Sequence, residues 1–340
     1  MGFSNILKAE LYKLAKSKAL IKIAIAVIII FIASSVLYGL LYNLIEGIGG
    51  FTIDGDITEE MVKASEEAIK DAEATYNSEN ALQQMHDTGV YQAKAMHALY
   101  KYMYENHLSF SSASVFGVTM GLSTNGYMTF MLQIMSAVII IFATITIVRS
   151  VAGERSNGTL KMQLLRPIKK EEMIGAKILA TWIVSIFILL FTFILSAIVG
   201  ICAFKMDAKQ VLMVINATKV VSVAPFVEQL ILLISNIGTI SAYIVLGTFL
   251  SLLVKKSEGA AIAIAMVVVL IGDDIESLLG YIFVGYVGVN INLGWTSALS
   301  ISGPALNHMN LYTMLAISIM WTAVLLTSSI FMFKKLEVHN

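Results

Sequence analysis

The sequence predicts an all-α, polytopic membrane protein with six transmembrane helices, both termini in the cytoplasm, and an extracytoplasmic helical hairpin after the first span. Three observations lead to this prediction. Of the 340 residues, 57% are hydrophobic and 14% are charged, whereas soluble domains average roughly 45–50% and about 25%. The apolar residues form blocks, and a helix crosses a bilayer with about 20 of them. Basic residues gather on one side of these blocks.

Six apolar blocks divide the chain into membrane and loop segments. The predicted segments are a cytoplasmic amphipathic surface helix at 1–18, the first span at 19–45, an acidic helical region outside the membrane at 46–127, the second span at 128–148, a cytoplasmic loop at 149–172, the third span at 173–204, an outer loop at 205–228, the fourth span at 229–254, a cytoplasmic loop at 255–258, the fifth span at 259–272, an outer or re-entrant segment at 273–310, the sixth span at 311–333 and a cytoplasmic tail at 334–340. The fifth block is short for a crossing, so the apolar stretch after it either continues the span or dips back into the membrane.

The distribution of lysine and arginine sets the predicted orientation. With six spans and a cytoplasmic N-terminus, the inner segments hold 16 of the 23 basic residues and only 6 acidic ones. Short loops rich in Lys and Arg stay in the cytoplasm, so both termini are predicted inside. The first block is too long for a signal peptide and no Ala-x-Ala site follows it, which predicts a retained span.

The first 18 residues predict a helix on the inner membrane surface. Phe3, Ile6, Leu7, Leu11 and Leu14 recur at helical spacing, with lysines between them. Such a basic amphipathic pattern is typical of an interfacial helix. An ordinary basic flank that fixes the orientation is the alternative, and the two interpretations are compatible.

The largest exposed segment, 46–127, is acidic and rich in helix-forming residues. Asp56-Ile57-Thr58-Glu59 reads as a capping box that opens a helix. Gly89 is the one glycine between there and His107, and it follows Asp87-Thr88. The pattern predicts a helical hairpin that turns near Gly89 and caps the membrane part.

The loop at 149–172 has the most specific sequence. Gly158 breaks the helix that leaves the membrane, and Pro167 stops the next one. Between them, Leu160, Leu164 and Leu165 lie on one side of a short helix. An apolar ridge with charged flanks suits a helix that docks in a groove of a cytoplasmic partner. The plainer alternative is a turn that only connects two helices.

This loop resembles that of the permease subunits of ABC-2 type transporters, nearest the branch related to bacterial sodium, antibiotic and copper-maturation exporters. The shared pattern is Glu154-x-x-x-Gly158-Thr159-Leu160, then Leu164-Leu165-x-Pro167, then Lys177 at the mouth of the next span. The layout of spans and the large outer loop after the first span also match.

The resemblance implies a function and a set of partners. It makes the segment from Glu154 to Pro167 the coupling helix, which docks on an ATPase subunit. Two permease copies, identical or related, would then work with two ATPase subunits in a bacterial cytoplasmic membrane, with membrane lipid around them. ATP and Mg would be bound by the ATPase, and the substrate would be an exported amphiphile such as a peptide, an antibiotic or a lipid-like molecule.

The chain itself predicts no catalytic, cofactor or metal site. Gly153-x-x-x-x-Gly158 resembles the start of a Walker A loop, but Thr159-Leu160 stands where Lys and Ser or Thr are required. ATP hydrolysis is therefore expected in a separate subunit. The single cysteine, Cys202, excludes an intrachain disulfide, and the net charge of zero gives no indication of nucleic acid binding.

Polar residues within two spans are candidates for a substrate pathway. Gln133 and Ser136 lie in the second span, and Asn236, Thr239 and Tyr243 lie in the fourth. Polar groups within a bilayer face protein or water, so these residues either line a pathway or hold helices together, and packing is the safer interpretation. The alternative function is a membrane receptor or scaffold whose acidic outer hairpin binds a partner.

Overall fold

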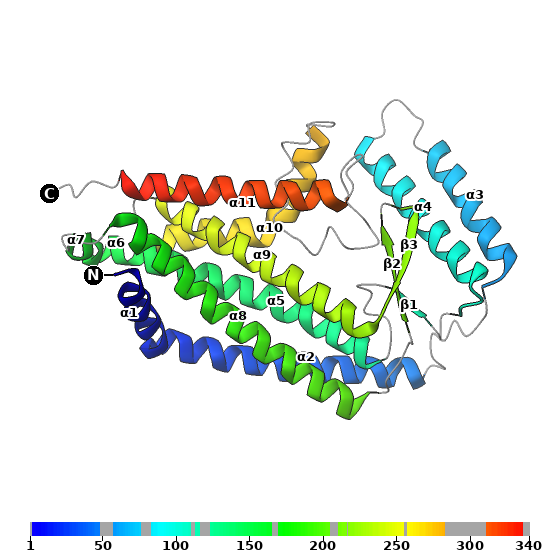
Figure 1. Ribbon diagram of the computed structural model, residues 1–340, viewed down its shortest axis with the longest axis horizontal. Helices are drawn as coiled ribbons and strands as arrows, with labels where there is room; N and C mark the ends of the chain where they lie inside the picture. The colour runs from blue at the N-terminus through cyan, green and yellow to red at the C-terminus, as the bar shows by residue number, and fades with distance from the viewer. Residues whose placement is uncertain are drawn as a thin grey trace.

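The computed structural model describes residues 2–47, 57–75, 83–109, 113–115, 123–164, 169–204, 210–215, 217–254, 257–282 and 311–335. The helices of its main body are α1 (Phe3–Lys16), α2 (Lys18–Gly47), α5 (Thr124–Val148), the π-helix η1 (Arg149–Gly153), α6 (Glu154–Ser156), α7 (Thr159–Leu164), α8 (Lys170–Ala203), α9 (Pro225–Leu253), α10 (Glu258–Ile282) and α11 (Leu311–Lys334). A smaller body contains α3 (Glu59–Thr75), α4 (Gln83–Glu105), β1 (Ala113–Val115), β2 (Gln210–Ile215) and β3 (Lys219–Val223). Figure 1 shows the long helices side by side, with the smaller body at one end and α1, α6 and α7 at the other.

Five of the described helices are long and apolar enough to cross a bilayer. They are Leu20–Leu41 in α2, Thr124–Ser156 from α5 through α6, Lys170–Ala203, Pro225–Leu253 and Leu315–Lys334 in α11. The chain is therefore a multi-pass membrane protein built on helices, and the count of six spans stays a prediction.

Helix α10 contains the predicted fifth span. Its apolar part, Glu258–Leu270, is shorter than the five spans, yet the helix continues to Ile282. The segment predicted as outer or re-entrant is thus helical up to Ile282, and its remaining residues lie outside the described part of the chain.

The helices α5 and α9 form the centre of the bundle and pack closely. A Cβ atom added at Gly247 of α9 would lie 2.9 Å from Ile147 Cγ2 and 3.1 Å from Thr144 Cγ2 of α5. Such separations are shorter than van der Waals contact, so the glycine is what allows the two helices to approach. Buried hydroxyls of α9, such as that of Thr248, donate to the carbonyl one turn earlier, which satisfies them without water.

Replacing Gly247 by alanine is expected to lower the stability by about 1 kcal/mol. Overpacking costs roughly 1–3 kcal/mol, and the better helix propensity of alanine returns about 1 kcal/mol. Gly39→Ala on α2 is the matched control, because nothing lies within 4 Å of its added Cβ. Thermal unfolding in detergent measures both. A Gly247→Ala protein at least as stable as Gly39→Ala would contradict the close α5–α9 contact.

The smaller body is made from two segments far apart in the sequence. Strand β1 pairs parallel with β2, and β2 pairs antiparallel with β3. Leu99 and Met103 of α4 share a buried apolar cluster with Leu212 and Val214 of β2. The three strands add a small sheet to the predicted all-α architecture, and β2 and β3 lie where the sequence predicted only an outer loop.

The predicted turn of the outer hairpin is wrong. Helix α3 ends at Thr75 and α4 begins at Gln83, so the turn precedes Gly89, which lies inside α4. A single glycine lowers the stability of a helix by about 1 kcal/mol. The packing of the neighbouring turns of α4 on α3 and on β2 outweighs this loss.

Helix α1 forms where the surface helix was predicted, and it packs on α8. Ile6 and Glu10 are its buried side chains, and the ring of Phe3 lies against Gly175 of α8. Ser17 ends α1 and also caps α2, because its hydroxyl donates to Leu14 O and accepts from Leu20 N. One face of the helix thus buries a carboxylate in the protein.

Candidate functional site

The second span ends in an irregular helical segment. Helix α5 continues through the π-turn η1 and α6, and π-turns inside α-helices are frequent at functional sites. The helix stops at Gly158, which has φ of +72°, a left-handed conformation that glycine adopts at little cost. Thr159 then begins α7, and its hydroxyl donates to Glu154 O at 3.1 Å. We call residues 149–164 the coupling segment.

Four charged side chains meet beside this segment, and we call Glu10, Lys13, Glu154 and Lys177 the charge cluster. Lys177 Nζ donates to Glu10 Oε1 at 3.0 Å, to Glu154 Oε2 at 2.7 Å and to Ser150 Oγ at 3.3 Å. Lys13 forms an ion pair with Glu154 and lies 3.9 Å from Glu10 Oε2. Two ammonium groups and two carboxylates therefore neutralise one another.

The charge cluster is buried apart from Lys13. The side chain of Lys177 has no exposed surface, whereas half of the Lys13 side chain is exposed. Burial lowers the pKa of Lys13, as does the neighbouring Lys177 ammonium, and the Glu10 carboxylate opposes both effects. Because an isolated buried charge is costly and a paired one is tolerated, the cluster holds α1, α6 and α8 in one arrangement.

Arg155 joins the coupling segment to α9. Its guanidinium donates to Ser251 O at 2.9 Å and to Leu252 O at 3.5 Å, and it also bonds Val254 O. These carbonyls end α9 and have no partner within the helix, and a cation at a helix C-terminus is favourable.

Replacing Arg155 by methionine is expected to lower the stability by about 2 kcal/mol, since hydrogen bonds to a charged group contribute roughly 1.5–3 kcal/mol. Arg149→Met is the matched control. Its guanidinium pairs with Glu258 at 3.1 Å, but the side chain is 56% exposed, and an exposed ion pair contributes about 0–1 kcal/mol. The unfolding midpoints of the two variants test this difference. Equal losses of stability would contradict the larger contribution assigned to Arg155.

The coupling segment also touches α10. Glu258 stands in the first turn of α10, and a Cβ at Gly153 would lie 3.0 Å from its Oε2. Three successive residues therefore contact different helices: Gly153 contacts α10, Glu154 contacts α1 and α8, and Arg155 contacts α9.

The structure separates the predicted coupling residues into different roles. Leu160 is 3% exposed and belongs to the main apolar core, so it anchors α7 to the bundle. Met162, on the same helix, is 66% exposed and was missed, because a single methionine carries no pattern. The side chain of Leu164 and all of Leu165 and Pro167 lie outside the described part.

The predicted pathway residues differ in how far they are buried. Ser136, Asn236 and Thr239 are buried, and each donates to a carbonyl of its own helix. Gln133 is exposed and Tyr243 is half-buried.

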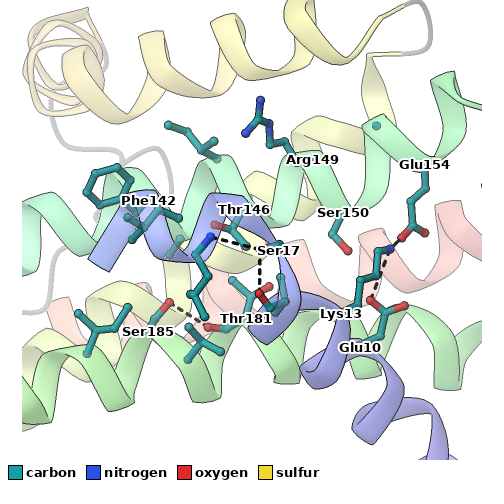
Figure 2. A pocket seen from close by; sticks show the side chains of 18 of the residues that line it. Glu10, Lys13, Ser17, Phe142, Thr146, Arg149, Ser150, Glu154, Thr181 and Ser185 are labelled. Carbon is teal, nitrogen blue, oxygen red and sulfur yellow. Dashed lines mark hydrogen bonds and ion pairs between the residues drawn. The ribbon is translucent and has the colours of Figure 1, made fainter. Parts of the chain in front are cut away.

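A cavity of about 550 Å³ lies elsewhere, between α1, α2, α5 and α8, and none of the predicted pathway residues lines it. Figure 2 shows Glu10, Lys13 and Glu154 of the charge cluster at its edge. The cavity was not predictable from a local pattern, because its wall is assembled from helices that are far apart in the sequence.

A family model described as "ABC-2 family transporter protein" matches residues 54–333. The match spans most of the chain, from five residues before α3 into the last turn of α11, and includes the whole coupling segment. Helices α1 and α2 precede it. No curated protein matches the chain.

Proposed function

This chain belongs to the ABC-2 family of transporter proteins, and from that premise we propose that it exports an amphiphilic substrate with ATP hydrolysed by a separate subunit. Membership makes the chain the membrane permease subunit of an ABC transporter and implies association with an ABC ATPase. The proposal extends to the direction of transport, the class of substrate and the place of contact.

We place the ATPase contact on α6 and α7. Ser156, Asn157 and Met162 are exposed on this segment, at the end of the bundle that the distribution of Lys and Arg predicts to be cytoplasmic. An exposed apolar side chain on a short helix beside polar residues suits a groove in the partner. ATP and Mg would be held by that partner, with two ATPase subunits below two copies of the permease.

One observation carries this proposal: among the described residues, the coupling segment is bonded to α1, α8, α9 and α10. The charge cluster ties it to α1 and α8, Arg155 ties it to α9, and Arg149 ties it to α10. A displacement of α7 by a moving ATPase would therefore reach these helices together, as rigid-body rearrangement requires.

The substrate is proposed to be amphiphilic, such as a peptide, an antibiotic or a lipid-like molecule. In support, Ile23, Phe142 and Ile188 form an apolar part of the cavity wall, while three members of the charge cluster, Glu10, Lys13 and Glu154, stand at its edge. Ligand sites are commonly of this size, mostly apolar, with a few polar groups that fix orientation.

Purification of the tagged chain from its native membrane tests the proposal. An ATPase subunit is expected to co-purify, and inside-out vesicles that contain the complex are expected to take up at least one member of a panel of amphiphilic peptides, antibiotics and fluorescent phospholipids when ATP is added. Absence of any ATPase from the purified material would overturn the proposal and favour the receptor or scaffold.

A further inference from the structure

One face of α2 changes its surroundings halfway along the helix. Val27, Phe31, Ser34 and Tyr38 follow at helical spacing and are buried. Phe31 and Tyr38 belong to one apolar cluster with Tyr127 and Met131 of α5, and Tyr127 also shares a hydrogen bond with Ser35 of α2, at 2.7 Å. This half of α2 is thus packed on the bundle.

The same face continues toward α1 with looser packing, where Ile23 contacts only the edge of that apolar cluster. Leu20 and Ile23 extend the spacing of Val27, yet they are only half-buried, and all three line the cavity. Apolar side chains at i, i+3 and i+7 form a stripe that is buried against a neighbour in a packed helix. Here the stripe faces a space of about 550 Å³.

The cavity is apolar in its interior and charged at one end. Phe142, Val184 and Ile188 form part of the opposite wall, and hydroxyl groups such as that of Ser185 interrupt it. At the end next to α1, Glu10, Lys13, Arg149, Glu154 and Glu258 line the rim. In Figure 2 the guanidinium of Arg149 points away from the group formed by Glu10, Lys13 and Glu154.

The rim offers both signs of charge to a ligand. Lys13 and Arg149 are about half exposed, at 50% and 56% of their side chains, and Glu258 is 31% exposed. Acidic groups stand beside each cation, so a purely anionic head group would meet carboxylates as well as the two cations. A head group with one positive and one negative charge matches this rim better.

We propose that this cavity binds one zwitterionic phospholipid of the cytoplasmic leaflet, and that the coupling segment responds to its occupancy. An acyl chain would lie against the stripe of α2 inside the cavity, and the head group would lie at the rim. The site faces the leaflet because α2 is a predicted span whose remaining side chains, such as Ile25 and Ile29, are exposed.

The coupling part of the proposal follows from shared residues. Arg149, Ser150, Gly153 and Glu154 line the cavity and also form the coupling segment. A bound head group would therefore contact the groups that tie α7 to α1 and α8. This part rests on the proposed function, whereas binding of the lipid does not.

Photo-crosslinking of the full-length protein in nanodiscs tests the binding. The probe is phosphatidylethanolamine with a diazirine in one acyl chain, and the labelled peptides are mapped by mass spectrometry. Labels are expected on Ile23, Phe142 or Ile188. Unlabelled phosphatidylethanolamine is expected to compete for these labels, whereas phosphatidylglycerol competes weakly.

Two pairs of variants make the test specific. Val184→Trp and Ile23→Trp fill the cavity, whereas Ile183→Trp and Ile25→Trp place the same ring on the exposed faces of the same helices. Excluding even two methylene groups weakens lipid binding about tenfold, so cavity labelling should fall by about that factor in the first member of each pair and stay unchanged in the second.

The outcomes separate the inference from the proposed function. Equal labelling in both members of each pair, or equal competition by phosphatidylglycerol, would overturn the lipid site even if an ATPase co-purifies. Labelling as expected, with an ATP hydrolysis rate in Val184→Trp complexes that does not differ from that of Ile183→Trp, would overturn the response of the coupling segment alone. Monodisperse elution of each variant verifies that it has folded.

Discussion

Lys177→Met is expected to lower the free energy of unfolding by about 3–5 kcal/mol. The Lys177 side chain has no exposed surface and pairs with both Glu10 and Glu154. Without it, two carboxylates that are almost fully buried share the half-exposed Lys13. Removal of one partner from a buried ion pair leaves an uncompensated charge, which costs about that amount.

Denaturant or thermal unfolding of the purified protein measures this loss. Lys8→Met is the control, since Lys8 lies on the same end of the bundle but is exposed on α1. The double variant Glu10→Gln with Lys177→Met is expected to regain part of the loss, because it removes one of the stranded carboxylates. A Lys177→Met protein as stable as Lys8→Met would show that the charge cluster does not hold α1, α6 and α8 together.

Met162→Glu is expected to weaken binding of the ATPase by about 2 kcal/mol, roughly thirtyfold. Met162 is the most exposed apolar side chain among those described on α7, and an anchor residue at the centre of an interface contributes at least about this much. The substitution places a charge in a groove expected to be apolar, while Leu160 continues to anchor the helix from its buried side.

Affinity measurements between the purified permease and its ATPase test this expectation, together with ATP-dependent uptake in vesicles. Met162→Leu keeps an apolar side chain and should bind normally. Tyr12→Glu introduces the same charge at a 61% exposed aromatic residue of α1 and should also bind normally. If Tyr12→Glu weakens binding and Met162→Glu does not, the contact lies on α1 and the assignment to α7 fails.

Features that depend only on residues close together in the sequence were predictable. Apolar blocks give helices because backbone groups in a bilayer must bond within their own segment, so α2, α5, α8, α9 and α11 follow from hydropathy alone. Gly158 and the short helix after it were also predictable, since a positive φ is adopted most readily by glycine. The pattern from Glu154 to Pro167 further indicated the family to which the chain belongs.

The candidate site was predictable only in part. Glu154 and Lys177 were singled out by their resemblance to a family pattern, without the pairing between them, and Leu160 was predicted to face a partner rather than the bundle. Glu10 was not predicted to belong to the site, because an acidic residue on a basic amphipathic helix is expected to be exposed to solvent. The turn of the outer hairpin was misplaced at Gly89 because local propensity was weighed without the packing of α4 on α3.

The sequence by itself determined the membrane class, the long helices and the position of the loop between α5 and α8, because hydropathy and turn geometry act over a few residues. Only the tertiary structure decided which groups meet. Glu10 and Lys177 are 167 positions apart, β1 and β2 come from different loops, and the cavity wall combines side chains of helices as far apart in the chain as α1 and α10. Charge pairing, sheet pairing and packing depend on distance in space, and no local pattern encodes that distance.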